Sequence, residues 1–248
     1  MNATIALFKK QLNDLPKNIS VTMMFVMFPA IAFLIGNFFE SIDGIVMQVN
    51  FAMMMASMGP MILVANTIAE DNEYKSLRFL IMAGVKPGQY LAGLISFAVV
   101  ISAIPMVAFA LMMGITGQNM LLFIALGIGA CLSASVLGAV IGLFSKNVQQ
   151  CSALYTPVMM VLAFIPFLSQ FNEAVEQIGR FVFTGQTFQA MADLAIDSYI
   201  SNADYIPYYL ADFPSFTDLP FALAVIGGNA LLFAILFAVA YSRKGLKG

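Results

Sequence analysis

The chain has 248 residues, of which 61% are hydrophobic and only 10% charged, and its mean hydropathy is +0.91. Soluble domains carry about 25% charged residues, so this composition excludes a soluble globular protein and predicts a membrane protein. Histidine, the commonest general base and metal ligand, is absent. The two cysteines, Cys131 and Cys151, lie in or beside apolar stretches, and their spacing predicts neither a disulfide framework nor a metal site.

Long intervals without any charged residue indicate where the chain crosses the membrane, because a spanning helix needs about 20 apolar residues. These intervals are 18–39, 44–69, 87–145, 147–172 and 219–242. The interval 87–145 is long enough for two helices, and the polar stretch 114–119 divides it. The sequence therefore predicts an all-α membrane protein, a single transmembrane domain over 1–248, with six spans. We place them at about 19–39, 45–68, 88–113, 120–144, 150–171 and 219–241.

The basic residues predict the orientation of these spans. Six spans place both termini on one side, and every Lys and Arg except Arg180 falls in a segment on that side. Because basic residues are enriched in cytoplasmic loops, we expect both termini to be cytoplasmic. The first apolar stretch follows three lysines, as a signal peptide would, but it is too long for one and no cleavage site follows it. We interpret it as a retained first span.

Two segments outside the spans have amphipathic or apolar patterns. Ile5, Phe8, Leu12 and Leu15 recur at helical spacing, which predicts a helix over 3–16 lying on membrane lipid at the cytoplasmic surface. The alternative is a frayed, solvated N-terminus. The outer loop 173–218 is too long for a plain connection. Its first part predicts short helices that dip into the outer leaflet, and its tyrosine-rich second part predicts an interfacial cap.

Small and polar residues within the spans suggest packing sites and a possible pathway. Ala130, Ala134, Gly138 and Gly142 form a stripe of small residues that predicts a close helix–helix contact, within the chain or across a dimer. Methionine is frequent in the first two spans, and flexible thioethers suit varied apolar substrates. Gap-filling and interhelical hydrogen bonds are the alternatives. The candidate pathway residues are Met27, Gln48, Asn50, Met54 and Met58.

Several kinds of chemistry are missing from the predicted spans. They contain no Asp, Glu, Lys or Arg, although ion-coupled carriers and voltage sensors depend on ionisable groups at membrane depth. No catalytic residue and no metal site are predicted. No G-x-x-x-x-G-K-[ST] phosphate loop occurs in the sequence, so any ATP-driven transport requires an ATPase on another polypeptide.

The segment between the second and third spans predicts a short cytoplasmic helix at about 70–84. It begins with Glu70, Asp71 and Glu73, which favour a helix N-terminus, and it stops at Gly84 before Pro87. Leu77, Leu80 and Ile81 share one face of this helix. Because the helix joins two spans on the cytoplasmic side, a soluble partner bound to it could push on both.

This segment resembles the cytoplasmic signature of the ABC type-2 export permeases. The matching residues are Glu73, Ser76-Leu77, Leu80, Ala83-Gly84-Val85 and Tyr90-Leu91-Ala92-Gly93. The chain departs from the usual pattern in having Lys75-Ser76 for Gly-Thr, Gly84 for Pro and Gly93-Leu94 for Gly-Lys. The predicted architecture is similar over nearly the whole chain, including re-entrant outer helices between spans five and six.

The resemblance implies a multi-pass transport subunit of the cell (plasma) membrane, not an enzyme. It implies a coupling helix that docks on a separate ABC ATPase subunit through Glu70, Glu73, Ser76, Leu77, Leu80, Ile81 and Gly84. ATP and Mg would bind that partner. A second permease subunit, identical or homologous, would complete a pathway lined by the first, second and fifth spans. The implied function is export of a peptide, lipid or drug; no nucleic-acid partner is predicted. An ion-coupled carrier or channel and a membrane immunity or scaffold protein remain alternatives.

Overall fold

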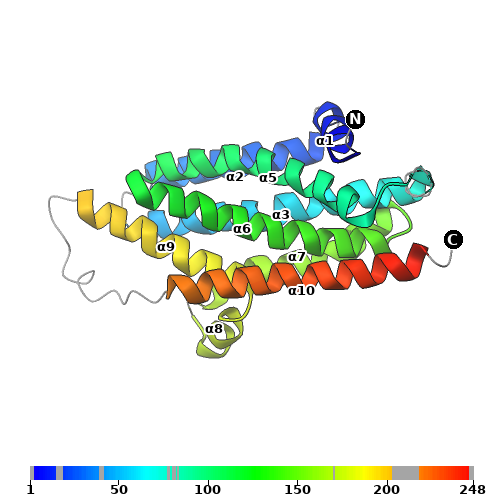
Figure 1. The fold of residues 1–248 in the computed structure, drawn as a ribbon. Coiled ribbons are helices and arrows are strands. Elements are labelled where there is room, and N and C mark those ends of the chain that lie inside the picture. The colour runs from blue at the N-terminus through cyan, green and yellow to red at the C-terminus, as the bar shows by residue number, and fades with distance from the viewer. Residues whose placement is uncertain are drawn as a thin grey trace.

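A computed structural model describes residues 3–14, 19–38, 42–76, 79, 82, 84–169, 171–202 and 218–245. All regular secondary structure in these ranges is helical, and Figure 1 shows the helices as an elongated bundle. The elements are α1 (Ala3–Asp14), α2 (Ile19–Phe38), α3 (Ile42–Glu73), α5 (Pro87–Met112), α6 (Gly117–Phe144), α7 (Val148–Ser169), α8 (Glu173–Gly179), α9 (Phe183–Asn202) and α10 (Leu219–Gly245).

Helices α3 and α6 form the centre of the bundle. Five helices, α3, α5, α6, α7 and α10, are long and apolar enough to cross a membrane, and α2 has a shorter apolar stretch, Thr22–Phe38. In α3, 78% of the most apolar stretch is buried inside the bundle, against 17% in α7 and in α10. The last two helices therefore leave most of their apolar surface for lipid or another chain.

The stripe of small residues on α6 lies against α3. Ala130 and Ala134 are fully buried. A Cβ atom on Gly142 would lie 2.6 Å from the carbonyl oxygen of Ala65, and one on Gly138 would collide with the backbone of Met61. The contact is thus within the chain, and it needs glycine because the two backbones approach too closely for a side chain.

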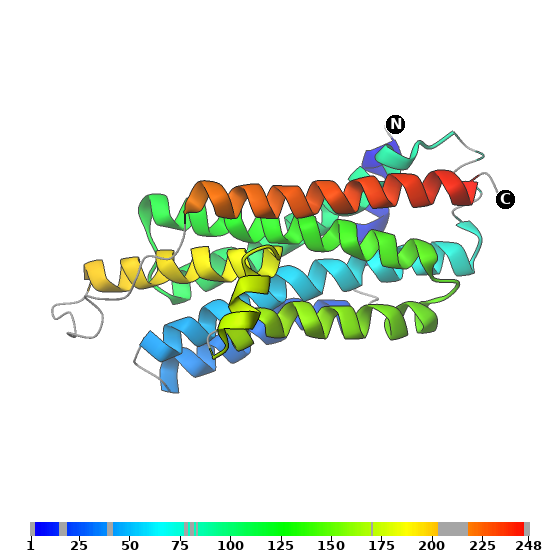
Figure 2. The same ribbon diagram turned by 90° about the horizontal axis from the view of Figure 1, so that it is seen from below.

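Helix α1 crosses the other helices near the end of the bundle where α10 ends (Figures 1 and 2). Leu7 is buried against Gly93 of α5, and the ring of Phe8 packs edge-on against Phe97 at 5.7 Å. Ile5 and Leu12 are exposed on the other side. The helix is present as predicted. Its predicted apolar stripe is divided, because Phe8 packs against the bundle whereas Ile5 and Leu12 are exposed. Leu15 lies outside the described residues.

Two predicted boundaries differ from the structure. Helix α3 continues to Glu73, so Glu70, Asp71 and Glu73 belong to its last turns and do not begin a separate helix. Helix α9 has 20 residues, and its first half is buried among α3, α6, α7 and α10, whereas the sequence predicted only short helices here. The tyrosine-rich part of the outer loop falls largely in 203–217, outside the described residues.

Candidate functional site

The candidate site is the last part of α3, at the end of the bundle that carries α1. Helix α3 ends where Lys75 takes a φ of 59°, a left-handed conformation that stops the helix. Three acidic residues sit close to this C-terminus, where the helix dipole disfavours negative charge. Groups on other helices stabilise two of them, Asp71 and Glu73. We call Lys10, Gln11, Thr67, Asp71, Asn72, Glu73 and Tyr90 the α3 polar cluster.

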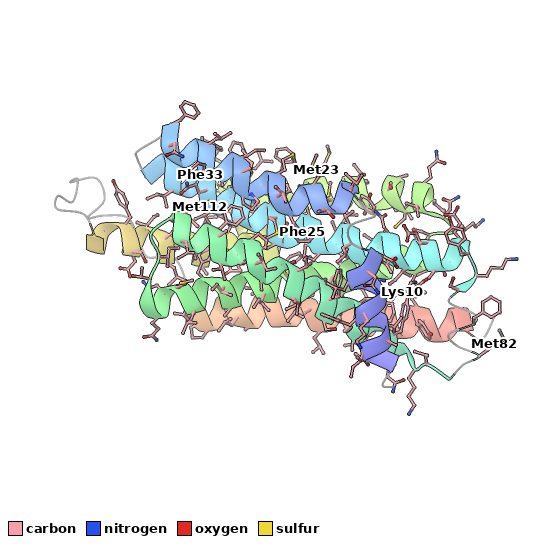
Figure 3. All side chains as sticks on the ribbon, turned by 90° about the horizontal axis from the view of Figure 1, so that it is seen from above. Lys10, Met23, Phe25, Phe33, Met82 and Met112 are labelled. Atoms are coloured by element: carbon pink, nitrogen blue, oxygen red, sulfur yellow. The ribbon has the colours of Figure 1, made fainter. Side chains whose placement is uncertain are left out.

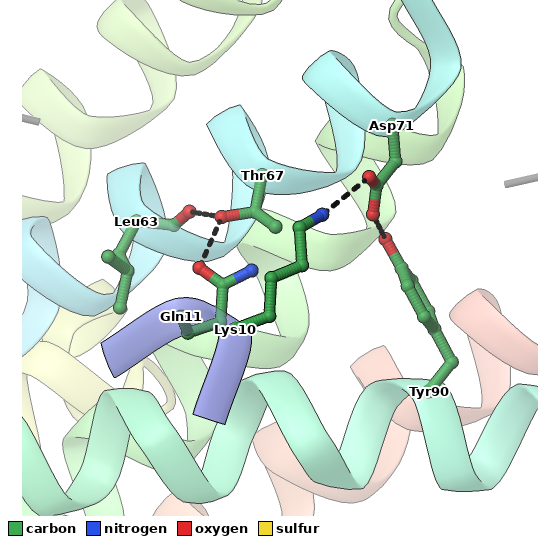
Figure 4. Close-up of polar contacts among 6 residues, drawn as sticks. All are labelled: Lys10, Gln11, Leu63, Thr67, Asp71 and Tyr90. Atoms are coloured by element: carbon green, nitrogen blue, oxygen red, sulfur yellow. Dashed lines mark hydrogen bonds and ion pairs between the residues drawn. The ribbon is translucent and has the colours of Figure 1, made fainter. Parts of the chain in front are cut away.

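Asp71 is the centre of this cluster, and its side chain is only 5% exposed. The ammonium of Lys10 on α1 lies 3.1 Å from Oδ1 of Asp71. The hydroxyl of Tyr90 on α5 donates to Oδ2 at 2.7 Å (Figure 4). Each carboxylate oxygen thus has a partner from a different helix. A buried carboxylate is costly without such partners. The burial of Asp71 is therefore stable only while α1 and α5 keep Lys10 and Tyr90 beside it.

Thr67 connects α1 to α3 one turn earlier. Its Oγ1 lies 2.9 Å from the carbonyl oxygen of Leu63 and 3.3 Å from Oε1 of Gln11 (Figure 4). Gln11 is buried beneath α1. Together with the ion pair of Lys10, this contact fixes two consecutive residues of α1 on α3.

Asn72 and Glu73 connect α3 to the other side of the bundle. The side-chain amide of Asn72 donates to the carbonyl oxygens of Gly142 and Ser145, both at 3.0 Å, which lie at the end of α6. Oε2 of Glu73 accepts from the backbone N–H of Val148 at 3.3 Å, where α7 begins. A carboxylate is favourable at a helix N-terminus. The end of α3 is therefore bonded to α1, α5, α6 and α7.

The chain leaves this cluster after Glu73 and re-enters the bundle at Pro87. Of the predicted coupling residues, Glu70 and Glu73 lie exposed on the last turns of α3, and Ser76 is partly buried. Gly84 is exposed with a φ of 77°, which favours glycine. Leu77, Leu80 and Ile81 lie outside the described residues. Phe79 and Met82 are 67% and 73% exposed, so this segment presents apolar side chains away from the bundle.

The predicted pathway residues lie on two helices, Met27 on α2 and the other four on α3. Nε2 of Gln48 donates to the carbonyl oxygen of Ala32 at 3.1 Å, so Gln48 joins α3 to α2. Asn50 is buried, and its Oδ1 has no partner among the described residues. Met54 and Met58 are partly buried against the core, whereas Met27 is exposed on α2. The contact of Gln48 is the interhelical hydrogen bond that the sequence left as an alternative.

Sequence reasoning missed the pairing of Lys10, Asp71 and Tyr90. These residues are 61 and 19 positions apart in the sequence, and no local pattern connects them. The only signal was that an acid and a base occur near the ends of neighbouring predicted helices. No group of three or more metal-ligating side chains occurs in the part of the chain that the structure describes.

A family model described as ABC-2 family transporter protein matches residues 37–242. The chain belongs to the ABC-2 transporter family. The resemblance drawn from residues 73–93 is thereby confirmed over most of the sequence. No match was found among the curated proteins. An ABC-2 permease is a transmembrane transport subunit and has no catalytic role of its own. In this ABC-2 permease, the α3 polar cluster lies at the start of the segment that carries the family signature.

Proposed function

We propose that this chain is the permease subunit of an ATP-driven exporter and that residues 74–86 dock on a separate ATPase. The observation that carries the proposal is the α3 polar cluster. The docking segment follows a helix end that is bonded to four other helices. A movement of the docked segment would therefore be transmitted to α3 and, through these bonds, to α1, α5, α6 and α7.

Exposed apolar side chains give the proposed docking surface its chemistry. Phe79, Met82 and Tyr74 are all exposed at this end of the bundle. Exposed apolar groups of this size are typical of protein interfaces. Lys75 and Lys86 flank Phe79 and Met82 in the sequence and are also exposed. A soluble ATPase with an apolar groove and an acidic rim would fit this surface.

The proposed topology has six spans and both termini in the cytoplasm. Helix α2, with its apolar stretch Thr22–Phe38, is the first span, and the five longer apolar helices are the other five. The α1 end carries Lys9, Lys10, Lys75, Lys86 and Lys146, in agreement with a cytoplasmic location. ATP and Mg would bind the partner subunit, and a second permease chain would pack beside this one.

The proposed substrate is amphipathic or apolar, such as a peptide, a lipid or a drug. Helix α2 supports this proposal because Met23, Met27 and Phe33 are exposed on it, and Figure 3 shows Met23 and Phe33 on its outer side. Flexible thioethers and an aromatic ring suit a surface that meets varied apolar shapes. A second permease chain facing α2 would enclose a pathway lined by these apolar side chains.

ATPase stimulation tests the docking proposal. In the reconstituted complex, Phe79→Asp and Met82→Asp should abolish co-purification of the ATPase and its stimulation by substrate. The control is Gln149→Asp, which adds the same charge to an exposed position at the same end of the bundle. Normal stimulation in Phe79→Asp and Met82→Asp would contradict the docking assignment. Ion-dependent flux without any ATPase would contradict the proposed function itself.

A further inference from the structure

The turn between α8 and α9 lies at the surface of the bundle, about halfway along it, and Phe181 in this turn is 70% exposed. The side-chain amide of Asn229 donates to the carbonyl oxygen of Phe181, in this turn, at 3.1 Å. Asn229 is ten residues beyond Leu219, where α10 begins, so the turn lies about 15 Å along α10 from its first residue. It lies a similar distance from Tyr241 at the other end of the apolar stretch.

Helix α9 gives the same depth independently. Near its C-terminus Asp197 accepts from the side-chain amide of Asn119, at the start of α6, at 3.1 Å. Phe183, which begins α9, is 14 residues earlier, or about 21 Å along the helix. Met191, between them, lies against Gly127 of α6. Helix α9 therefore begins at about the middle of the bundle and runs towards its far end.

Helix α8 is held at this depth on the side of the bundle. A Cβ on Gly179 would lie 3.3 Å from Ile165 of α7, and Gly185 is packed directly on the backbone of Gly179. In Figure 1, α8 projects from the side of the bundle, and in both Figures 1 and 2 α9 continues towards the far end. The position of α8 is thus fixed by close backbone contacts.

One face of α8 is charged and polar. Glu173, Glu176, Gln177 and Arg180 share this face by helical spacing, and Arg180 donates to Glu176 at 2.8 Å. Glu173, Gln177 and Arg180 are exposed. Ionisable side chains at membrane depth are costly unless they face protein or water. A lipid-facing position at mid-bundle is therefore excluded for this face.

We propose that the charged face of α8 lines a water-filled recess, which enters the membrane from the end of the bundle carrying Asn119 and Asp218 and reaches about its middle. The recess lies beside α8, which packs on α7 and α9. The inference does not depend on ATP-driven export, because it rests on the depth and charge of α8 and on the exposure of Glu173, Gln177 and Arg180, which no described part of the chain covers. It places water halfway through a bundle whose other exposed helix surfaces, on α7 and α10, are apolar.

Cysteine accessibility tests this inference. Cys131 and Cys151, both buried, are first replaced by alanine in the full chain. Glu173→Cys and Gln177→Cys are then treated in membrane vesicles with a charged, membrane-impermeant thiosulfonate, added to each face in turn. The lipid-exposed control at the same depth is Leu231→Cys, two residues from Asn229 on α10. Thiols react as thiolates and need water, so we expect both α8 cysteines to react at least about tenfold faster than the control.

Two results would overturn the proposal. If neither α8 cysteine reacts faster than Leu231→Cys from either face, α8 is not hydrated. If Leu231→Cys reacts as fast as the α8 cysteines, this depth is not hydrocarbon and no recess is needed. Gln177→Cys removes no charge and keeps the test valid if Glu173→Cys does not accumulate. Neither result bears on whether an ATPase docks at 74–86, which the stimulation experiment decides.

Discussion

The two regions that hold this permease together do so by different means. At the α1 end, the α3 polar cluster joins helices through long side chains that carry charges or hydrogen-bonding groups. At the α8–α9 turn, glycine lets backbones touch, and one asparagine amide fixes a carbonyl group. The first region should therefore be sensitive to loss of charge or hydrogen bonding, and the second to an increase in side-chain size.

The largest expected effect is steric and comes from the second region. Gly185→Val places a side chain on the backbone of Gly179, which cannot move without displacing α8. We expect the free energy of unfolding to fall by about 3 kcal/mol, the upper part of the range for overpacking. Because Cys131 and Cys151 are buried, a thiol-reactive dye in a thermal melt reports the unfolding. Gly227→Val is the control, since nothing lies within 4 Å of a Cβ there; equal melting of the two variants would contradict the close contact.

The next largest effect tests the charges of the first region. Asp71→Ala removes the partner of Lys10 and leaves the buried Tyr90 hydroxyl without its acceptor. Leaving a buried donor unsatisfied costs roughly 1–3 kcal/mol, and we expect about 2 kcal/mol in the same melt. Glu70→Ala removes the same charge from an exposed position one residue away and should cost under about 0.5 kcal/mol. If the two variants melt alike, Asp71 does not organise the cluster.

A smaller effect is expected from the hydroxyl of Tyr90 alone. Tyr90→Phe keeps the buried ring and removes one hydrogen bond to Asp71. Asp71 keeps Lys10, so the loss should be about 1 kcal/mol. Tyr74→Phe, at an exposed tyrosine beside the cluster, should leave the melting temperature unchanged. A loss in Tyr90→Phe as large as that in Asp71→Ala would mean that the ion pair of Lys10 contributes nothing.

The smallest effect is expected from loss of the hydrogen bond between Asn229 and the α8–α9 turn. Asn229→Leu frees the carbonyl oxygen of Phe181, and interhelical hydrogen bonds in membrane proteins average about 0.6 kcal/mol. We expect a loss of that size, because water in the proposed recess can hydrate the carbonyl group. The control Asn37→Leu removes an amide that donates within its own helix, to the carbonyl oxygen of Phe33. A loss of several kcal/mol in Asn229→Leu would indicate a dry environment.

Most spans could be predicted from the sequence, whereas the ends of the helices could not. A charge is costly in hydrocarbon, so the intervals between charges already indicated α5, α6, α7 and α10 to within a few residues. The end of α3 was placed too early because Glu70, Asp71 and Glu73 look like the start of a helix. In the structure, Asp71, Asn72 and Glu73 are bonded to Tyr90 and to the α6–α7 connection, which are distant in sequence.

The depth of α9 was also hidden from the sequence. Its first half contains Thr184, Gln186 and Thr187, all of them buried, and this polarity is typical of an exposed loop. Only the contacts of Phe181, Met191 and Asp197 with α10 and α6 reveal that the helix enters the bundle. The small-residue stripe on α6 was predictable as a contact, but its partner α3 was not, because spacing on one helix does not identify the facing one.

The central claim is that an ATPase docks on residues 74–86, and crosslinking tests it most directly. A photo-reactive amino acid placed at Met82, which is exposed beyond the α3 polar cluster, is activated in cells expressing the otherwise unchanged chain. The account predicts a crosslink to a polypeptide that contains a G-x-x-x-x-G-K-[ST] phosphate loop, and none from the control position Gln149, exposed at the same end. A crosslink from Met82 only to proteins without that loop, or equal crosslinking from Gln149, would contradict it.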